Sequence, residues 1–416
     1  MATESNMIPQ SAPPKIRDPR LDFFRGIAML IIFIAHVPWN YWKLFIPARY
    51  GPSDAAEMFV FCSGFAAAIA FGGTFVRKGF WLGTARILYR IYQIYIAHIM
   101  MFFLIAGTVV IATAWFGESM GDRNYVTDLG LNPFFEADTG AQLVGLFTLT
   151  YVPNYFDILP MYIGVLCMVP VVVLCQRIHI GVAIGFVFGL YALALFFGWN
   201  FPAEPWSDRQ WYFNPLGWQL LFFTGFAISR GWVKVPEPTP LLVGLALLIV
   251  VFGFLIGNTP TWTSSETLSA IRETIRPWLL TKTYHGLFRW AHFLALAYLA
   301  VALLKGREHY LYSSLFAPIR KVGQQALSSF ILSMALSRVA GVAIDYVGKE
   351  DRLGVAIVNL AGLATVIGFA YFAGWVKSHP WSVKSGAPAV PGVTEQATRT
   401  GATASGSSGK KAAVVE

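Results

Sequence analysis

Long apolar segments separated by short polar ones recur along most of the chain. The segments lie near 22–38, 55–76, 88–115, 157–175, 180–198, 214–229, 240–257, 288–304, 324–346 and 354–376. Most contain about 17–25 residues, which is enough for a helix to cross a hydrocarbon core of roughly 30 Å. The pattern predicts an all-α, polytopic membrane protein with about ten transmembrane helices over 21–376. The segments near 22–38 and 214–229 are short and are expected to be tilted or partly re-entrant.

Basic residues are distributed unequally between the two sets of loops. If segment 1–20 is cytoplasmic, the loops on its side carry 16 Lys and Arg before the distal tail, and the opposite loops carry nine. Because cytoplasmic loops are enriched in Lys and Arg, this asymmetry favours two cytoplasmic termini and an even number of helices. In 385–416, Gly, Ser, Ala and Thr dominate without an apolar period. We expect that segment to be a disordered cytoplasmic tail.

Composition agrees with the membrane assignment and changes the interpretation of the net charge. Hydrophobic residues make up 56% of the chain, charged residues 13%, and the mean hydropathy is +0.56. A soluble domain is about 45–50% apolar and about 25% charged. The net charge of +9 would suit a nucleic-acid partner, but the basic residues follow the topology, so we expect none. No zinc-type Cys/His spacing, Walker loop or dinucleotide fingerprint occurs, so no metal site is expected and any chemistry belongs to the helices and short loops.

The first two apolar segments contain the clearest candidates for chemistry, because ionisable groups within spans are costly and tend to line cavities. Arg25 and His36 are eleven residues apart, so a helix places them on one face, about 16 Å apart along its axis. Asp54 and Glu57 open the second segment at the depth of His36, where a carboxylate can fix an imidazole tautomer. The alternative is a snorkelling Arg, an interfacial His and two acids favoured by a helix dipole.

The third apolar segment begins with a basic face. Arg86, Arg90 and Gln93 share that face at i, i+4 and i+7, and His98 follows deeper in the membrane. A basic helix entrance on the cytoplasmic side suits a phosphorylated ligand, since Arg binds phosphate through paired hydrogen bonds. A plain positive-inside anchor explains the same residues and is the simpler interpretation.

Several later helices have polar or aromatic residues at their predicted outer ends. This arrangement suits a carbohydrate-facing cleft, because aromatic faces and amide or carboxylate groups bind sugar rings. Interfacial Trp and helix caps account for part of it without a ligand. Within the ninth segment, Arg338 has Asp345 seven residues on as a possible partner. The outer-end residues are Asn154, Asp157, Asn214, Trp218, Gln219, Arg289 and His292.

Five blocks of the sequence together resemble the OpgC family, bacterial inner-membrane proteins linked to succinylation of osmoregulated periplasmic glucans. The blocks are RLDFFRGIAMLIIFIAHVPWN, SDAAEMFVFCSGFAAAIAFG, YVPNYFDILPMYI, FNPLGWQLLF and RWAHFLALAYL. They occur in order, and the resemblance runs from about 17 to 376. The family is related to membrane acyltransferases of surface polysaccharides, which carry an Arg–ten residues–His motif in the first helix. Arg25 and His36 match that motif.

The resemblance implies an acyltransferase domain over 21–376 in the bacterial inner membrane. Its donor is expected to be a cytoplasmic acyl-coenzyme A, in this family succinyl-coenzyme A, used as a co-substrate rather than a bound cofactor. Its acceptor is expected to be a periplasmic glucan, and its general base His36. The residues expected around these substrates are, for catalysis, Arg25, His36, Asp54 and Glu57, and, for coenzyme A, Arg86, Arg90 and Gln93.

A transporter or exporter of a glycan or an acyl donor is the competing, non-enzymatic interpretation. Transporters often contain two similar halves with interrupted helices, and the first and second five segments show no clear similarity. The sequence leaves open which acyl group and glycan are used, and whether hydroxyl or amino groups are acylated. It also leaves open whether a covalent acyl-enzyme forms, and what the oligomeric state is.

Overall fold

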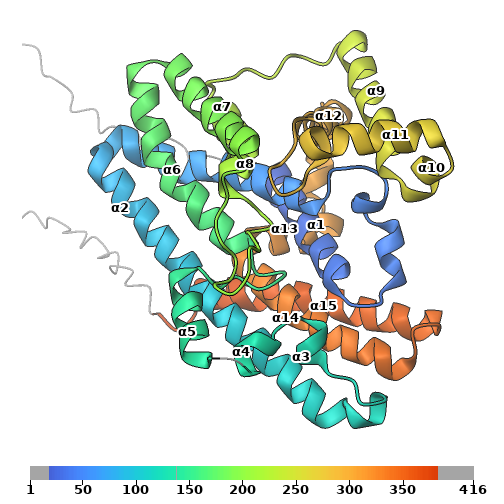
Figure 1. Cartoon of the computed structure of the whole chain (residues 1–416). Coiled ribbons are helices and arrows are strands. Elements are labelled where there is room, and N and C mark those ends of the chain that lie inside the picture. The colour runs from blue at the N-terminus through green and yellow to red at the C-terminus, as the bar shows by residue number, and fades with distance from the viewer. Residues whose placement is uncertain (1–17, 137, 383–416) are drawn as a thin grey trace, which may run out of the picture. The chain divides into compact units, whose positions relative to one another are not determined.

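The structure is a computed structural model and describes residues 18–136 and 138–382. In this part of the chain all regular elements are helices, apart from one isolated antiparallel bridge between Pro202 and Gln210. The chain contacts define two units, and the first, through Lys377, contains every described helix (Figure 1). The prediction of an all-α chain is confirmed. The predicted tail, 385–416, lies outside the described residues.

Every predicted apolar segment is helical. Seven helices within the described ranges are long and apolar enough to cross a membrane, namely α2, α6, α7, α9, α12, α14 and α15. Because α2 contains two predicted segments and α1 and α8 are not among the seven, the count of ten crossings stays a prediction. The helices that cover the predicted segments are α1 (Pro19–His36), α2 (Ala55–Phe116), α6 (Ile158–Ile178), α7 (Ile180–Phe197), α8 (Pro215–Ser229), α9 (Pro240–Gly257), α12 (Leu287–Leu304), α14 (Ala326–Val347) and α15 (Arg352–Lys377).

The connections between these helices contain short elements that the apolar pattern does not predict. They are η1 (Tyr41–Phe45), η2 (Pro47–Arg49), η3 (Glu118–Met120), α3 (Tyr125–Asp128), α4 (Asn132–Glu136), α5 (Thr139–Thr148), α10 (Thr259–Thr263), α11 (Glu266–Ile275), η4 (Arg276–Leu280), η5 (Glu308–Tyr312), η6 (Ser314–Phe316) and α13 (Ala317–Gln324). Many helix starts follow from local sequence. Asn214, for example, accepts a hydrogen bond from the Leu216 amide and precedes Pro215 at the first helical position, a favourable N-terminal cap.

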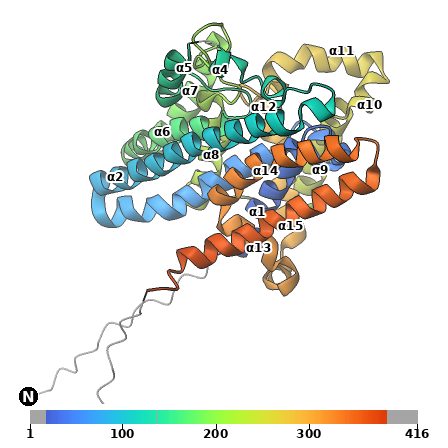
Figure 2. The ribbon, with the colours of Figure 1, turned by 90° about the horizontal axis from the view of Figure 1, so that it is seen from below.

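Helix α2 reverses direction at Gly79, so the second and third apolar segments form one hairpin. Gly79 has φ 83° and ψ 177°, a conformation open almost only to glycine. The two arms then pack together: Arg86 donates a hydrogen bond to the Thr74 hydroxyl at 2.7 Å. Figure 2 shows the arms running side by side. The 62 residues of α2 are therefore two helices joined at the Gly79 kink.

Glycines let the first arm of α2 approach α8 closely. A Cβ at Gly64 would lie 1.9 Å from the Phe222 carbonyl oxygen, and a Cβ at Gly225 would lie 2.4 Å from that of Phe61. The two helices therefore meet backbone to backbone through a glycine on each. Small residues at such contacts are favoured in membranes, where association depends on packing rather than on exclusion of water. This contact holds α8 against the helix that begins beside the candidate site.

Replacing Gly225 with leucine should separate α2 from α8 and destabilise the protein. Overpacking typically costs about 1–3 kcal/mol, and the obstructing atom here is backbone, which cannot rotate away. We expect a lower Tm for Gly225→Leu in thermal unfolding of the detergent-purified protein. Gly189→Leu is the matched control, because nothing lies within 4 Å of a Cβ built at that position. Equal Tm values for both variants would contradict the close approach.

Candidate active site

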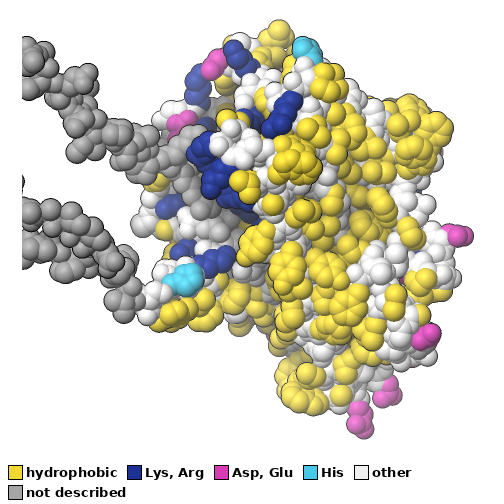
Figure 3. Space-filling model, turned by 90° about the vertical axis from the view of Figure 1, so that its left-hand side faces the viewer, with side chains coloured by type: hydrophobic (Ala, Val, Ile, Leu, Met, Phe, Trp, Pro, Cys, Tyr) yellow, Lys and Arg dark blue, Asp and Glu magenta, His cyan; other side chains and the backbone are white. Residues whose placement is uncertain are grey.

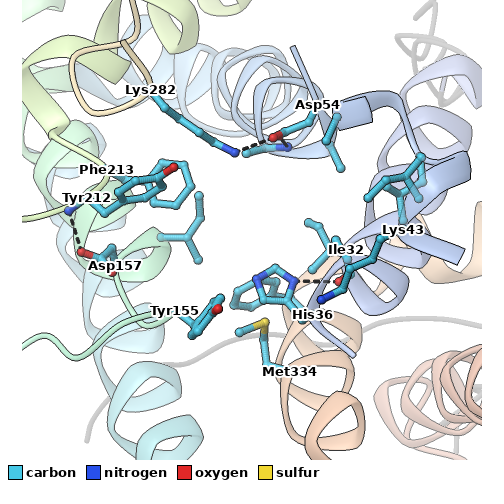
Figure 4. A pocket seen from close by; sticks show the side chains of 18 of the residues that line it. Ile32, His36, Lys43, Asp54, Tyr155, Asp157, Tyr212, Phe213, Lys282 and Met334 are labelled. Atoms are coloured by element: carbon cyan, nitrogen blue, oxygen red, sulfur yellow. Dashed lines mark hydrogen bonds and ion pairs between the residues drawn. The ribbon is translucent and has the colours of Figure 1, made fainter. Parts of the chain in front are cut away.

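A cavity of about 590 Å³ lies where α1 ends and α2 and α6 begin. Side chains of α14 and of the loops that precede α8 and α12 complete its wall. Figure 4 shows polar groups from these separate segments around one open space. Four residues singled out from the sequence line it: His36, Asp54, Asn154 and Asp157.

His36 is the last residue of α1 and is held by its own helix. Its Nδ1 lies 2.7 Å from the Ile32 carbonyl oxygen. A carbonyl only accepts hydrogen bonds, so Nδ1 must carry the proton, and in the neutral ring Nε2 keeps its lone pair. The His36 ring also contacts the ring of Tyr155 edge to face, with 5.6 Å between centroids. The arrangement leaves a proton-accepting nitrogen at the edge of the cavity (Figure 4).

Asp54 and Glu57 pair with cations rather than with His36, which corrects the expectation that Asp54 or Glu57 orients the imidazole. Asp54 caps α2 through the Ala56 amide at 2.8 Å and forms an ion pair with Lys282. Glu57 accepts the Asp54 amide, which completes a capping box, and it binds the Arg289 Nε at 2.9 Å. No hydrogen bond joins either carboxylate to His36 among the described residues. The physical reason is charge: an ammonium or guanidinium is a stronger partner than a neutral ring.

The Asp54–Lys282 pair is ionised despite its burial. Burial alone would raise the pKa of Asp54, but the charges of Lys282 and Arg289 outweigh it and hold that pKa below its usual value. Burial likewise works to lower the pKa of Lys282, but Asp54 and Glu57 raise it. Burial, and then the charge of Arg289, lower the pKa of the neighbouring His285. A neutral imidazole therefore lies beside the Asp54–Lys282 and Glu57–Arg289 pairs.

Most of the residues expected to contact sugar hold the scaffold together instead. Five of the seven are buried and do not line the cavity. Trp218 donates its indole N–H to the Lys282 carbonyl at 2.9 Å, and the His292 Nδ1 lies 2.8 Å from the Ser53 hydroxyl. Buried polar groups need partners, and these side chains supply them. The five are Asn214, Trp218, Gln219, Arg289 and His292.

Arg338 lies beside Tyr155 and not with Asp345, which corrects the pairing considered from the sequence. Its guanidinium stands over the Tyr155 ring, 4.9 Å from the centroid. Asp345 instead binds Arg123 at 3.3 Å and Lys349 at 3.7 Å. Seven residues along a helix is nearly two turns, so the two side chains point the same way but lie about 10 Å apart along the axis.

A second, basic cavity of about 410 Å³ lies at the turn of the α2 hairpin. It is lined by Thr74, Arg77, Lys78, Leu82 and Arg86. Among the residues expected to bind coenzyme A, only Arg86 is here; Arg90 and Gln93 lie farther along α2 and bond to each other at 3.0 Å. The turn of the α2 hairpin lies on the left-hand side of Figure 1. Figure 3 views the molecule from that side and shows a group of Lys and Arg side chains there.

Arg25 is half-buried on α1 and does not line either cavity. It is within electrostatic range of the Cys62 thiol on α2 and of the Tyr162 hydroxyl on α6. It lies earlier on α1 than His36. Sequence reasoning missed Lys43, Tyr155, Tyr212 and Lys282 of the cavity wall. The two lysines carried one usable signal, because they are among the few basic residues of the loops predicted to be outside.

The helices and the cavity define a multi-pass membrane protein with an ionisable site at the end of its first helix. The family model described as OpgC protein matches residues 17–378. The chain therefore belongs to the OpgC family, and membership suggests an acyltransferase of periplasmic glucans. No curated protein and no solved structure matches the chain.

Breaking the buried Glu57–Arg289 pair should destabilise the protein more than removing both charges. Arg289→Met leaves the Glu57 carboxylate buried without its cation, and such single losses cost about 3–5 kcal/mol. The double variant Glu57→Leu/Arg289→Met replaces both charges with apolar groups and should recover part of the loss. Thermal unfolding in detergent measures both. Lys305→Met, whose pair with Glu237 is exposed, is the control and should leave Tm nearly unchanged. A double variant that is no more stable than Arg289→Met would contradict the argument.

Proposed function

We propose that this protein is a membrane O-acyltransferase that transfers a succinyl group from cytoplasmic succinyl-coenzyme A to a hydroxyl of a periplasmic glucan. The observation that carries the proposal is the state of His36. Its Nδ1–H is bound to the Ile32 carbonyl, which leaves Nε2 to accept a proton at the edge of a cavity large enough for a sugar unit and an acyl group. Family membership supports the same reaction class.

In the proposed reaction His36 acts as the general base. Its Nε2 takes the proton of the glucan hydroxyl while the oxygen attacks the thioester carbonyl, and a C–O bond forms. The tetrahedral intermediate then collapses, the C–S bond breaks, and the coenzyme A sulfur leaves with the proton that His36 returns. Lys282, held in the wall by Asp54, contributes positive charge where negative charge develops on the carbonyl oxygen. Direct transfer of this kind needs no covalent acyl-enzyme.

The acceptor is proposed to bind along the Asn154–Asp157 segment. Tyr155 is 52% exposed and offers an aromatic face to a sugar ring. Burial raises the pKa of Asp157 to about 6, and one of its oxygens accepts the Tyr212 amide at 2.8 Å. The second oxygen can meet a sugar hydroxyl. Of the residues expected at the glycan from the sequence, this proposal keeps Asn154 and Asp157.

The donor is proposed to enter from the opposite membrane face, with its phosphates at the basic cavity of the α2 hairpin. Arg77, Lys78 and Arg86 line that cavity. We infer ten crossings, two cytoplasmic termini and location in the bacterial inner membrane. The support is that ten segments are helical and that basic residues are concentrated in the loops on one side.

His36→Ala should fold normally and lose acyl transfer by about 10²–10⁴-fold, the usual loss when a general base is removed. His36→Gln keeps a hydrogen-bonding side chain but cannot take a proton, so it should not restore activity. The measurement is transfer of labelled succinyl from succinyl-coenzyme A to glucan by the purified protein in detergent. His309→Ala, at an exposed site, is the control. Wild-type turnover in His36→Ala would rule out His36 as the base. No turnover by the wild type, with glycan movement in sealed vesicles, would favour a transporter.

Arg77→Gln and Arg86→Ala should weaken binding of the donor but not of the acceptor. Loss of a hydrogen bond to a charged group costs about 1.5–3 kcal/mol, which predicts a clear rise in KM for succinyl-coenzyme A with an unchanged KM for glucan. Arg77 is included because Arg86 also ties the hairpin through Thr74. Lys234→Gln, an exposed basic residue outside the cavity, is the control. If neither KM changes, these residues serve only as topological anchors.

A further inference from the structure

The wall of the His36 cavity carries more positive than negative side chains. Lys43, Arg49 and Lys282 line it, together with the acids Asp54 and Asp157. Asp54 is committed to Lys282. No ion pair joins Lys43 or Arg49 to an acid in the described ranges, and only Lys43 of these two is within electrostatic range of His36. The cavity therefore has an uncompensated cation next to the proposed base.

Lys43 is presented by a firmly anchored turn. It belongs to η1, which is capped by Asn40 through the Trp42 amide at 3.0 Å. Asn40 and Asn359 of α15 exchange two amide hydrogen bonds, at 2.8 and 3.0 Å, and both side chains are buried. The pairing fixes the turn against the helix bundle. The Lys43 ammonium thus reaches the cavity from a defined backbone position rather than from a free loop (Figure 4).

Arg338 adds a second positive charge behind the first. It lies one turn beyond Met334, which lines the cavity, and its guanidinium stands over the Tyr155 ring. The Arg338 Nε and Nη2 are buried and have no hydrogen-bond partner among the described residues. Burial lowers the pKa of Lys43, and the charge of Arg338 lowers it further. Two such cations near each other are costly, and a bound anion between them would relieve that cost.

We propose that Lys43 binds the free carboxylate of the transferred acyl group, with Arg338 as a positioning residue that adds charge and holds Tyr155 against the site. The cavity would thereby select acyl donors with a terminal carboxylate over neutral acyl donors of the same length. The inference rests on the proposed function. In a succinyl group, three bonds separate the thioester carbon from the carboxylate carbon. The thioester carbon must meet the acceptor at His36, so the carboxylate lies a short distance from His36, within the cavity that Lys43 also lines.

The other anions of the reaction fit this position less well. The phosphates of coenzyme A have their own basic cavity at the α2 hairpin, and the acceptor brings a hydroxyl to the base. The oxyanion of the intermediate is short-lived, whereas the acyl carboxylate is present in the bound donor from the start. Lys43 is therefore a binding residue for the donor, and its loss should appear as a change in donor preference rather than as a general loss of chemistry.

The test compares succinyl-coenzyme A with butyryl-coenzyme A, which has the same chain length but ends in a methyl group. We measure kcat/KM for both donors with glucan as acceptor, using the full chain purified in detergent. The wild type should prefer succinyl. Lys43→Met should lower kcat/KM for succinyl-coenzyme A by 10-fold or more while leaving the value for butyryl-coenzyme A unchanged or higher, and Lys43→Arg should keep the preference. Arg338→Met should reduce the preference, and Arg338→Lys should restore it.

Lys349→Met is the matched control, because Lys349 is a nearby cation that covers Trp39 and does not line the cavity. Its donor preference should equal that of the wild type. An active Lys43→Met with unchanged preference would overturn the inference and leave the proposed function standing. A wild type that uses both donors equally would overturn it without any variant. A wild type that transfers neither acyl group would remove the proposed function, and the inference with it.

Discussion

The interaction on which the site depends is the pairing of buried charges where α2 begins. Asp54 and Glu57 meet Lys282 and Arg289, residues more than 220 positions later in the chain. Charges away from water must find partners. These two pairs therefore fix the first turn of α2 against the loop before α12 and the start of α12. Asp54 and Lys282 form part of the cavity wall beside His36 because these contacts hold them in place.

The lipid environment explains why so much of the fold was predictable. A bilayer requires long apolar helices, and the ten apolar segments accordingly became helices with nearly the expected ends. The short elements were not predictable in the same way, because helices such as α11 lie outside long apolar segments and depend on local caps. A reversal between the second and third segments was expected, but its place at Gly79 was not, since the Gly72–Gly73 pair and Gly79 give no sign of which glycine adopts a positive φ.

The candidate site was predictable only in part, for a different reason. His36, Asp54, Asn154 and Asp157 reached the cavity because His36 ends α1 where α2 and α6 begin, and the other three residues precede α2 or α6. Asn214 and Trp218 have the side chains that bind sugars, but the same groups also cap helices and satisfy buried carbonyls, and here they do the latter. The pairing of Lys282 with Asp54 could not be found from sequence, because the two residues are 228 positions apart.

The hydrogen bond between the His36 ring and the Ile32 carbonyl has a consequence for large acceptors. Both ends of that bond belong to the last turn of one helix, so the imidazole needs no second segment to select its tautomer. A displacement of the loops around the cavity would therefore leave the proposed proton-accepting nitrogen in place. For the proposed reaction, a base fixed in this way suits an acceptor threaded past the site rather than enclosed by it.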